Sequence, residues 1–131
     1  MKLTKNFSKQ EFDSRDGSPM PPEVLLNVQK LASQLQALRD VLNAPIRINS
    51  GYRSPSHNNA VGGSKNSQHV FGRAADIVVR GKTPKQVYDI IEGMIASGDM
   101  LQGGLGLYDT FVHYDIAFKA TKRRWDFRKN K

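Results

Sequence analysis

The stretch Asn66–Asp76, with the sequence N-S-Q-H-V-F-G-R-A-A-D, constrains this chain more than any other. An imidazole nitrogen from His69 and a carboxylate oxygen from Asp76 are both good ligands for a borderline metal ion such as zinc. Small residues between them, Gly72 among them, allow the tight turn that would bring the two ligands together. Asp76 also opens an apolar run that indicates a buried strand, so its carboxylate needs a metal or an arginine as a partner. On spacing alone, a structural ion pair and a metal site fit equally well.

A third potential ligand lies on a second predicted strand, far along the chain. The segment Phe111–Ala117 alternates apolar and polar residues, which predicts a strand with His113 and Asp115 on the same face. If the two strands meet, His69, Asp76 and His113 can bind one ion. Three protein ligands leave the fourth tetrahedral position for water, which is typical of a catalytic rather than a structural zinc.

Three motifs stand along the chain in a fixed order: Gly51-Tyr52-Arg53-Ser54, Ser67-x-His69-x6-Asp76 and Phe111-Val112-His113-Tyr114-Asp115. In order and spacing they resemble the M15 zinc peptidases, which are D-alanyl-D-alanine carboxypeptidases and the peptidoglycan endopeptidases used as bacteriophage endolysins. The resemblance extends from about Phe7 to Trp125. It implies an α+β fold of the hedgehog/D-Ala-D-Ala-peptidase type, with a small, mainly antiparallel sheet that carries one zinc ion and is flanked by helices. It also implies hydrolysis of the peptidoglycan stem peptide, by carboxypeptidase or endopeptidase action.

The resemblance further implies roles for individual residues. His69, Asp76 and His113 are the expected zinc ligands. Arg53 is expected beside the zinc, where its permanent charge and planar donor fork suit a substrate carboxylate or carbonyl. Three neighbouring residues are also candidates for substrate binding: Tyr52, Ser67 and Gln68.

Two aspartates are candidates for the group that accepts the proton of the attacking water. Several branches of the family have Asp or Glu three residues before the last zinc-binding histidine, but this chain has Thr110, which cannot act as a base. We favour Asp115, on the strand face of His113, as the base or as a close supporter of the zinc-bound water. Asp109 is the second candidate. In a further arrangement Asp115 binds the metal and His113 supports catalysis.

The remaining pattern predicts the helices and strands around this site. Apolar residues recur at spacings of three and four from Pro22 to about Leu42, which predicts the longest helix. A partner chain could bind the same apolar stripe, but we favour a place in the core because the chain has few other sources of core. Capping signals, prolines and apolar runs predict five shorter elements: a helical turn at Ser8–Asp13, a strand at Ile46–Ser50, a short helix at Ser54–Ala60, a helix from Thr83 to Ser97, and a strand at Gly103–Tyr108 that pairs with the His113 strand.

Composition narrows the class of protein. A chain of 131 residues suits a single domain, and the absence of cysteine excludes disulfides, thiolate ligands and a cysteine nucleophile. The G-x-S-x-G motif of serine hydrolases is also absent. The sequence has neither a secretory signal nor an apolar run long enough for a membrane span. We therefore expect a protein made in the cytoplasm that acts on the cell wall after release by lysis, as a phage or prophage lysin does, with a preference for a monomer.

The segment Lys119–Lys131 carries seven basic residues and one acidic residue, and so holds most of the formal net charge of +8. We expect a solvated basic tail that is attracted to anionic envelope polymers, with Trp125 packed on the core as in the family. Aromatic residues within a basic run also suit nucleic acid, which is the less favoured alternative. The other alternative is an inactive zinc-binding domain that binds cell wall without cleaving it.

Overall fold

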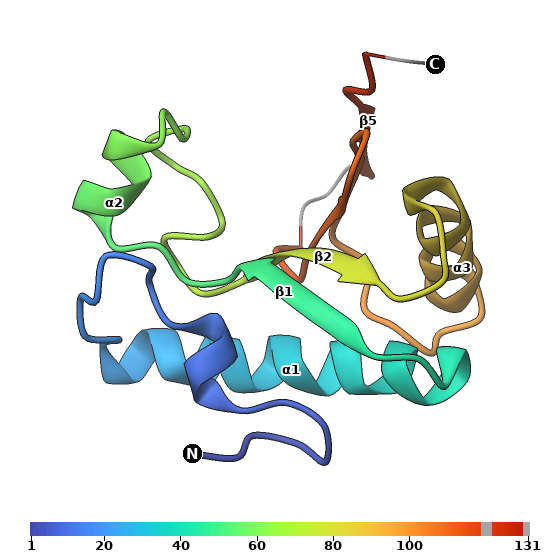
Figure 1. Cartoon of the computed structure of the whole chain (residues 1–131), viewed down its shortest axis with the longest axis horizontal. Coiled ribbons are helices and arrows are strands. Elements are labelled where there is room, and N and C mark those ends of the chain that lie inside the picture. Colours follow the sequence, from blue (N-terminus) through green and yellow to red (C-terminus); the bar gives the residue numbers. More distant parts are fainter. Residues whose placement is uncertain (119–121, 130–131) are drawn as a thin grey trace.

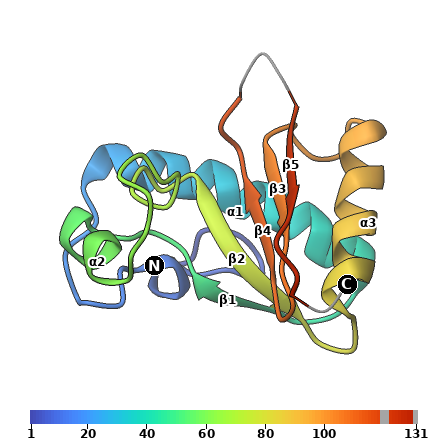
Figure 2. The ribbon, with the colours of Figure 1, turned by 90° about the horizontal axis from the view of Figure 1, so that it is seen from above.

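A five-stranded, mainly antiparallel sheet with strand order β1-β2-β4-β3-β5 forms the centre of the fold (Figure 1, Figure 2). The computed structural model describes residues 1–118 and 122–129. Neighbouring strands run antiparallel except β3 and β5, which are parallel. In chain order the elements are η1 (Lys9–Phe12, a 3-10 helix), α1 (Pro22–Leu42), β1 (Ile46–Ser50), α2 (Pro55–Ala60), β2 (Ala74–Val79), α3 (Pro84–Ala96), β3 (Gly104–Leu107), β4 (Val112–Asp115) and β5 (Arg123–Asp126). The predicted α+β class is confirmed.

One face of the sheet is the apolar core face. Ile77 of β2 lies opposite Ile48 of β1 and Val112 of β4, and Val112 in turn lies opposite Leu107 of β3. All four are buried in one cluster with the apolar stripes of α1 and α3. Figure 1 shows α1 running beneath β1 and β2. Because side chains alternate along a strand, the residues between these apolar positions point to the opposite face.

That opposite face, which we call the site face, carries the polar residues singled out by the sequence. Asp76 of β2 lies opposite His113 of β4, and Gly106 of β3 lies opposite His113 on one side and Trp125 of β5 on the other. Asp115 follows His113 by two residues and therefore shares its face. The pairing register alone thus sets Asp76, His113, Gly106 and Trp125 in one row across the sheet, with Asp115 further along the same face.

The two long helices begin and end where capping chemistry predicts. Pro22 opens α1, and Asn43 ends it in the left-handed conformation with φ 48°. Thr83 and Gln86 form a capping box at the start of α3, which satisfies backbone N–H groups that have no partner within the helix. Both helix predictions are confirmed, and the α1 stripe lies in the core rather than against a partner chain.

Loops tie the Arg53 segment to the N-terminal part of the chain. The Tyr52 N–H donates to the Phe12 carbonyl oxygen (2.8 Å), and the Ser54 hydroxyl donates to Asp16 (2.7 Å). The Ser54 hydroxyl oxygen also caps α2 by accepting from the His57 N–H (3.1 Å). Arg53 is therefore held between anchored neighbours although it lies outside the sheet.

The basic segment differs from its prediction as a solvated tail. Residues 123–126 form β5, a half-buried strand that pairs in parallel with β3. Arg123 and Trp125 have partners on the site face, which is why this stretch is ordered despite its charge. Lys119 and Lys131 lie outside the described residues. Within the described ranges, no helix is both long and apolar enough to cross a membrane.

The core role of α1 can be tested with one buried and one exposed position. Leu35 is fully buried, whereas Val41 on the same helix is 62 % exposed. We expect Leu35→Ala to lower the free energy of unfolding by about 2–5 kcal/mol, since it leaves a cavity. Val41→Ala should change it by no more than about 0.5 kcal/mol. Urea denaturation measures both values, and equal midpoints for the two variants would contradict the packing.

Candidate metal centre

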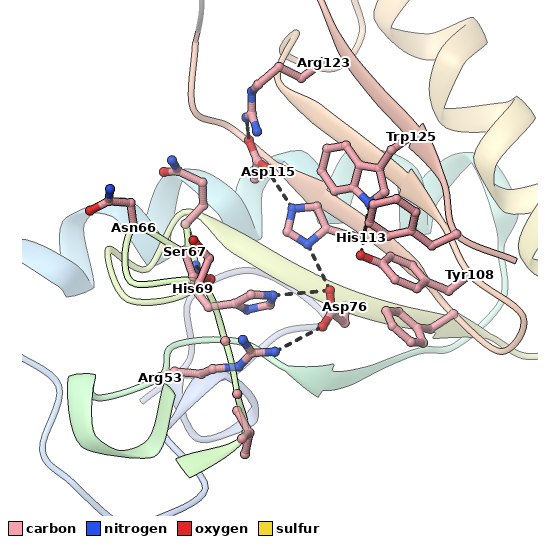
Figure 3. Close-up of a pocket in the computed structure, with 17 residues that line it drawn as sticks. Arg53, Asn66, Ser67, His69, Asp76, Tyr108, His113, Asp115, Arg123 and Trp125 are labelled. Atoms are coloured by element: carbon pink, nitrogen blue, oxygen red, sulfur yellow. Dashed lines mark hydrogen bonds and ion pairs between the residues drawn. The ribbon is translucent and has the colours of Figure 1, made fainter. Parts of the chain in front are cut away.

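His69, Asp76 and His113 come together on the site face, at the floor of a pocket (Figure 3). His69 comes from the loop before β2, Asp76 from β2 and His113 from β4. One candidate ligand atom from each residue lies within 4.8 Å of the other two, and all three side chains are buried. The predicted meeting of these residues is confirmed.

Both imidazole rings are held by an acceptor on the side away from Asp76. His69 Nδ1 lies 2.8 Å from the Gly51 carbonyl oxygen, so that Nε2 faces Asp76 Oδ1 at 3.3 Å. His113 Nε2 lies 2.8 Å from Asp115 Oδ2, and Nδ1 faces Asp76 Oδ1 at 3.0 Å. A proton on each outer nitrogen leaves a lone pair on each inner nitrogen, which is the form that binds a metal.

The surroundings of Asp76 and Asp115 favour the ionised form of both carboxylates. Burial raises the pKa of Asp76, but hydrogen bonds with His113 and His69 outweigh it and bring the pKa below its usual value. Burial likewise raises the pKa of Asp115. The hydrogen bonds with His113 and the Gly104 N–H have the larger effect, so that the pKa lies below its usual value. The centre therefore offers two imidazoles and a buried negative charge, a donor set that fits zinc.

Asp115 lies behind His113, at the ring edge away from Asp76. Its side chain is fully buried and accepts hydrogen bonds from the Gly104 N–H (2.9 Å), the Ala117 N–H (3.1 Å) and the Arg123 guanidinium. The converging ligand atoms come from His113 and not from Asp115. This geometry fits a residue that orients His113 through Nε2, and not a group that faces a zinc-bound water or binds the metal itself.

Arg53 lies beside the cluster, as the sequence predicts. Its Nη2 is 3.6 Å from Asp76 Oδ2, and Ser50 and Asn58 accept hydrogen bonds from its Nε and Nη1. Ser67 and Gln68 line the same pocket. The Ser67 hydroxyl oxygen accepts from the His69 N–H at 3.3 Å, so it also shapes the loop that carries the first ligand.

Two predicted residues lie elsewhere. Tyr52 is 5 % exposed and packs in the hydrophobic core, away from the residues that line the pocket, so the structure does not place it against a substrate. Tyr52 lies two residues beyond the end of β1, and its neighbour Arg53 lines the pocket instead. Asp109 accepts from the Lys129 N–H (3.1 Å) and lines a different hollow beside Thr83, so the candidate base does not face the metal centre.

One wall of the pocket, which has a volume of about 590 Å³, is aromatic and was not recognised from the sequence. Tyr108 and Phe111 stack with ring centroids 4.3 Å apart, and Trp125 lies 5.1 Å from the His113 ring. The Trp125 Nε1–H donates to the Tyr108 hydroxyl oxygen at 3.0 Å. The available signal was the alternation of Arg123, Trp125 and Phe127, which has the period of a strand.

Comparisons with known proteins agree with this centre. A family model described as Peptidase M15 matches residues 2–115. A zinc D-Ala-D-Ala carboxypeptidase of Streptomyces albus G is 47% identical over 45 residues. That match covers 34% of this chain and 18% of the relative, so the chain spans a minor part of the relative's length. The family match ends at Asp115, and β5 lies beyond it.

Metal binding itself can be tested without any substrate. We expect the protein to bind one zinc ion. Loss of a residue that only supports a ligand typically weakens metal binding by roughly 10- to 100-fold, and we expect His69→Ala and His113→Ala each to weaken it by more than that. His57→Ala, on α2 outside the cluster, is the control and should bind zinc like the unmodified protein. Competition with a chromophoric chelator measures the affinities, and unchanged zinc binding in both ligand variants would contradict the assignment.

Proposed function

The chain belongs to the M15 peptidase family, and on that basis we propose that it is a zinc-dependent peptidase of the bacterial peptidoglycan stem peptide. The observation that carries the proposal is the convergence of His69, Asp76 and His113 at the floor of a pocket large enough for a short peptide. The name of the similar Streptomyces protein supports both the metal and the substrate class.

A zinc ion held by these three residues would lower the pKa of a bound water and polarise the scissile carbonyl. The protein supplies the surroundings. Arg53 places a permanent positive charge at the rim of the cluster, where it can hold a substrate carboxylate or the carbonyl oxygen as negative charge develops there. Asp115 keeps the His113 ring in one orientation by binding Nε2.

The mode of cleavage depends on what Arg53 binds. If it holds a terminal carboxylate, the protein removes a single D-alanine as a carboxypeptidase. If the chain of the substrate continues past Arg53, the protein cuts within the stem peptide or cross-bridge as an endopeptidase. We favour the endopeptidase of a phage or prophage lysin, a preference that rests on likeness to the family and not on site chemistry.

Purified peptidoglycan tests the proposal directly. The protein is incubated with cell walls of several chemotypes, with and without a chelator, and released fragments are identified by mass spectrometry. We expect fragments that disappear with chelator and with His113→Ala and persist with His57→Ala. Free D-alanine would identify a carboxypeptidase and longer stem pieces an endopeptidase. A zinc-loaded protein that releases nothing from any wall would contradict hydrolysis and favour the inactive binding domain.

The supporting role of Asp115 leads to a separate prediction. Asp115→Asn keeps the size of the side chain but removes the charge that faces His113 and Arg123. We expect zinc affinity to fall by roughly 10- to 100-fold, the usual cost of losing a carboxylate that orients a ligating histidine. Asp99→Asn, at an exposed position near the end of α3, is the matched control. Circular dichroism confirms folding, and unchanged zinc affinity in the Asp115 variant would rule out the role.

A further inference from the structure

Both carboxylates that line the described part of the pocket already have hydrogen-bond or ion-pair partners. Among the described residues that line it, the acidic side chains are Asp76 and Asp115. Asp76 faces both imidazoles, and Asp115 is turned toward His113, Arg123 and backbone N–H groups. The other polar side chains of the pocket are therefore the ones to consider for contact with the substrate, among them those of the wall opposite Arg53.

Tyr108 is the polar group of the aromatic wall. It follows β3 on the same side as Gly104 and Gly106, and Gly106 lies directly opposite His113. Its ring stacks on Phe111 at an interplanar angle of 12°. Figure 3 shows the Tyr108 ring beside His113 and Asp76, across the cluster from Arg53. Strand register and ring stacking thus hold the hydroxyl on the metal side of the pocket.

The Tyr108 hydroxyl has a proton to donate. A phenol oxygen carries one donor and accepts through its lone pairs. Here the Trp125 indole N–H, which can only donate, occupies the acceptor side at 3.0 Å. Within residues 1–118 and 122–129, no acceptor for the hydroxyl proton is found. That proton is therefore available to a substrate in the pocket.

Trp125 can reach Tyr108 because β3 has a glycine, Gly106, where the indole ring passes over the strand. A Cβ on Gly106 would lie 2.3 Å from the Trp125 ring, closer than real contacts allow. With glycine there, the indole lies over β3 between His113 and Tyr108. Trp125 stands on β5, beyond the part of the chain that the family model matches.

We propose that Tyr108 is a catalytic residue that donates a hydrogen bond to the carbonyl oxygen of the scissile bond as that oxygen gains negative charge, and that Trp125 is the residue that positions it. The inference rests on the proposed peptidase function and adds a second donor to Arg53. The two donors approach the carbonyl from opposite walls. Preorganised donors of this kind act most strongly on the transition state, where the charge is largest.

Tyr108→Phe tests the donor with the loss of one oxygen atom and retention of the stack on Phe111. We expect kcat to fall by roughly 10²- to 10³-fold, as for loss of one oxyanion donor, while KM and zinc content stay within about twofold of the unmodified protein. Tyr88→Phe removes a hydroxyl on α3, outside the pocket, and should leave kcat unchanged.

Trp125→Phe tests the positioning residue. It removes the indole N–H and should lower kcat less than Tyr108→Phe does, because the hydroxyl remains. If Trp125 acts through that hydroxyl, the double variant should be no slower than Tyr108→Phe alone. Additive losses in the double variant would overturn the positioning role.

A readout that does not depend on turnover uses Trp125 itself, since it is the one tryptophan of the sequence. Its fluorescence can follow titration with a phosphinate analogue of a D-alanyl-D-alanine peptide, whose tetrahedral anion resembles the transition state. We expect Tyr108→Phe to weaken binding of the phosphinate by at least about 10-fold, in parallel with kcat. Equal phosphinate affinity in the unmodified and Tyr108→Phe proteins would overturn the inference.

The outcomes separate this inference from the function on which it rests. An active unmodified enzyme with full kcat in Tyr108→Phe contradicts the inference alone. Loss of zinc in step with loss of activity in Tyr108→Phe also contradicts it, because the tyrosine would then support the metal site. An unmodified, zinc-loaded protein that cleaves neither walls nor stem peptides contradicts the proposed function, and the inference fails with it.

Discussion

The antiparallel pairing of β2 with β4 is the constraint on which the rest of the site depends. It sets Asp76 opposite His113, and a shift of either strand by one residue would turn that strand's ligand into the core face. The apolar residues that alternate with them, such as Ile77 and Val112, make that shift costly because they would leave the core. Core packing and metal geometry are thus set by the same register.

The strands at the other side of the sheet then determine what surrounds the metal ligands. Glycines in β3 leave room on the site face, where a Cβ at Gly104 would meet Asp115 and Arg123 and one at Gly106 would meet Trp125. The parallel pairing of β5 fills that room with a guanidinium behind the His113–Asp115 pair and an indole beside the ring. The basic end of the chain, predicted as a solvated tail, is partly a wall of the pocket.

Local patterns were sufficient for the helices, for strands β1 to β4 and for the residues that could form a metal site. Helices α1 and α3 follow from apolar spacing together with proline and capping residues, and the β3–β4 hairpin follows from alternation around a short turn. The roles of Asp115, Asp109 and Tyr52 were harder to predict. Asp115 binds Nε2 of His113, the ring nitrogen that faces away from the metal centre. The spacing of two residues along one strand does not show which ring nitrogen a carboxylate contacts.

By itself, the sequence determined the α+β class, the approximate boundaries of the main elements, and His69, Asp76 and His113 as the residues that could form a metal site, because periodicity, caps and ligand chemistry act within short segments. Only the tertiary structure decided the orientation of Asp115, the burial of Tyr52 and the meeting of Tyr108 with Trp125. The contacts of Asp115 and of Trp125 depend on the pairing of β3 with β4 and β5, which no local pattern encodes. Long-range strand pairing, and not residue type, places the aromatic wall against the metal centre.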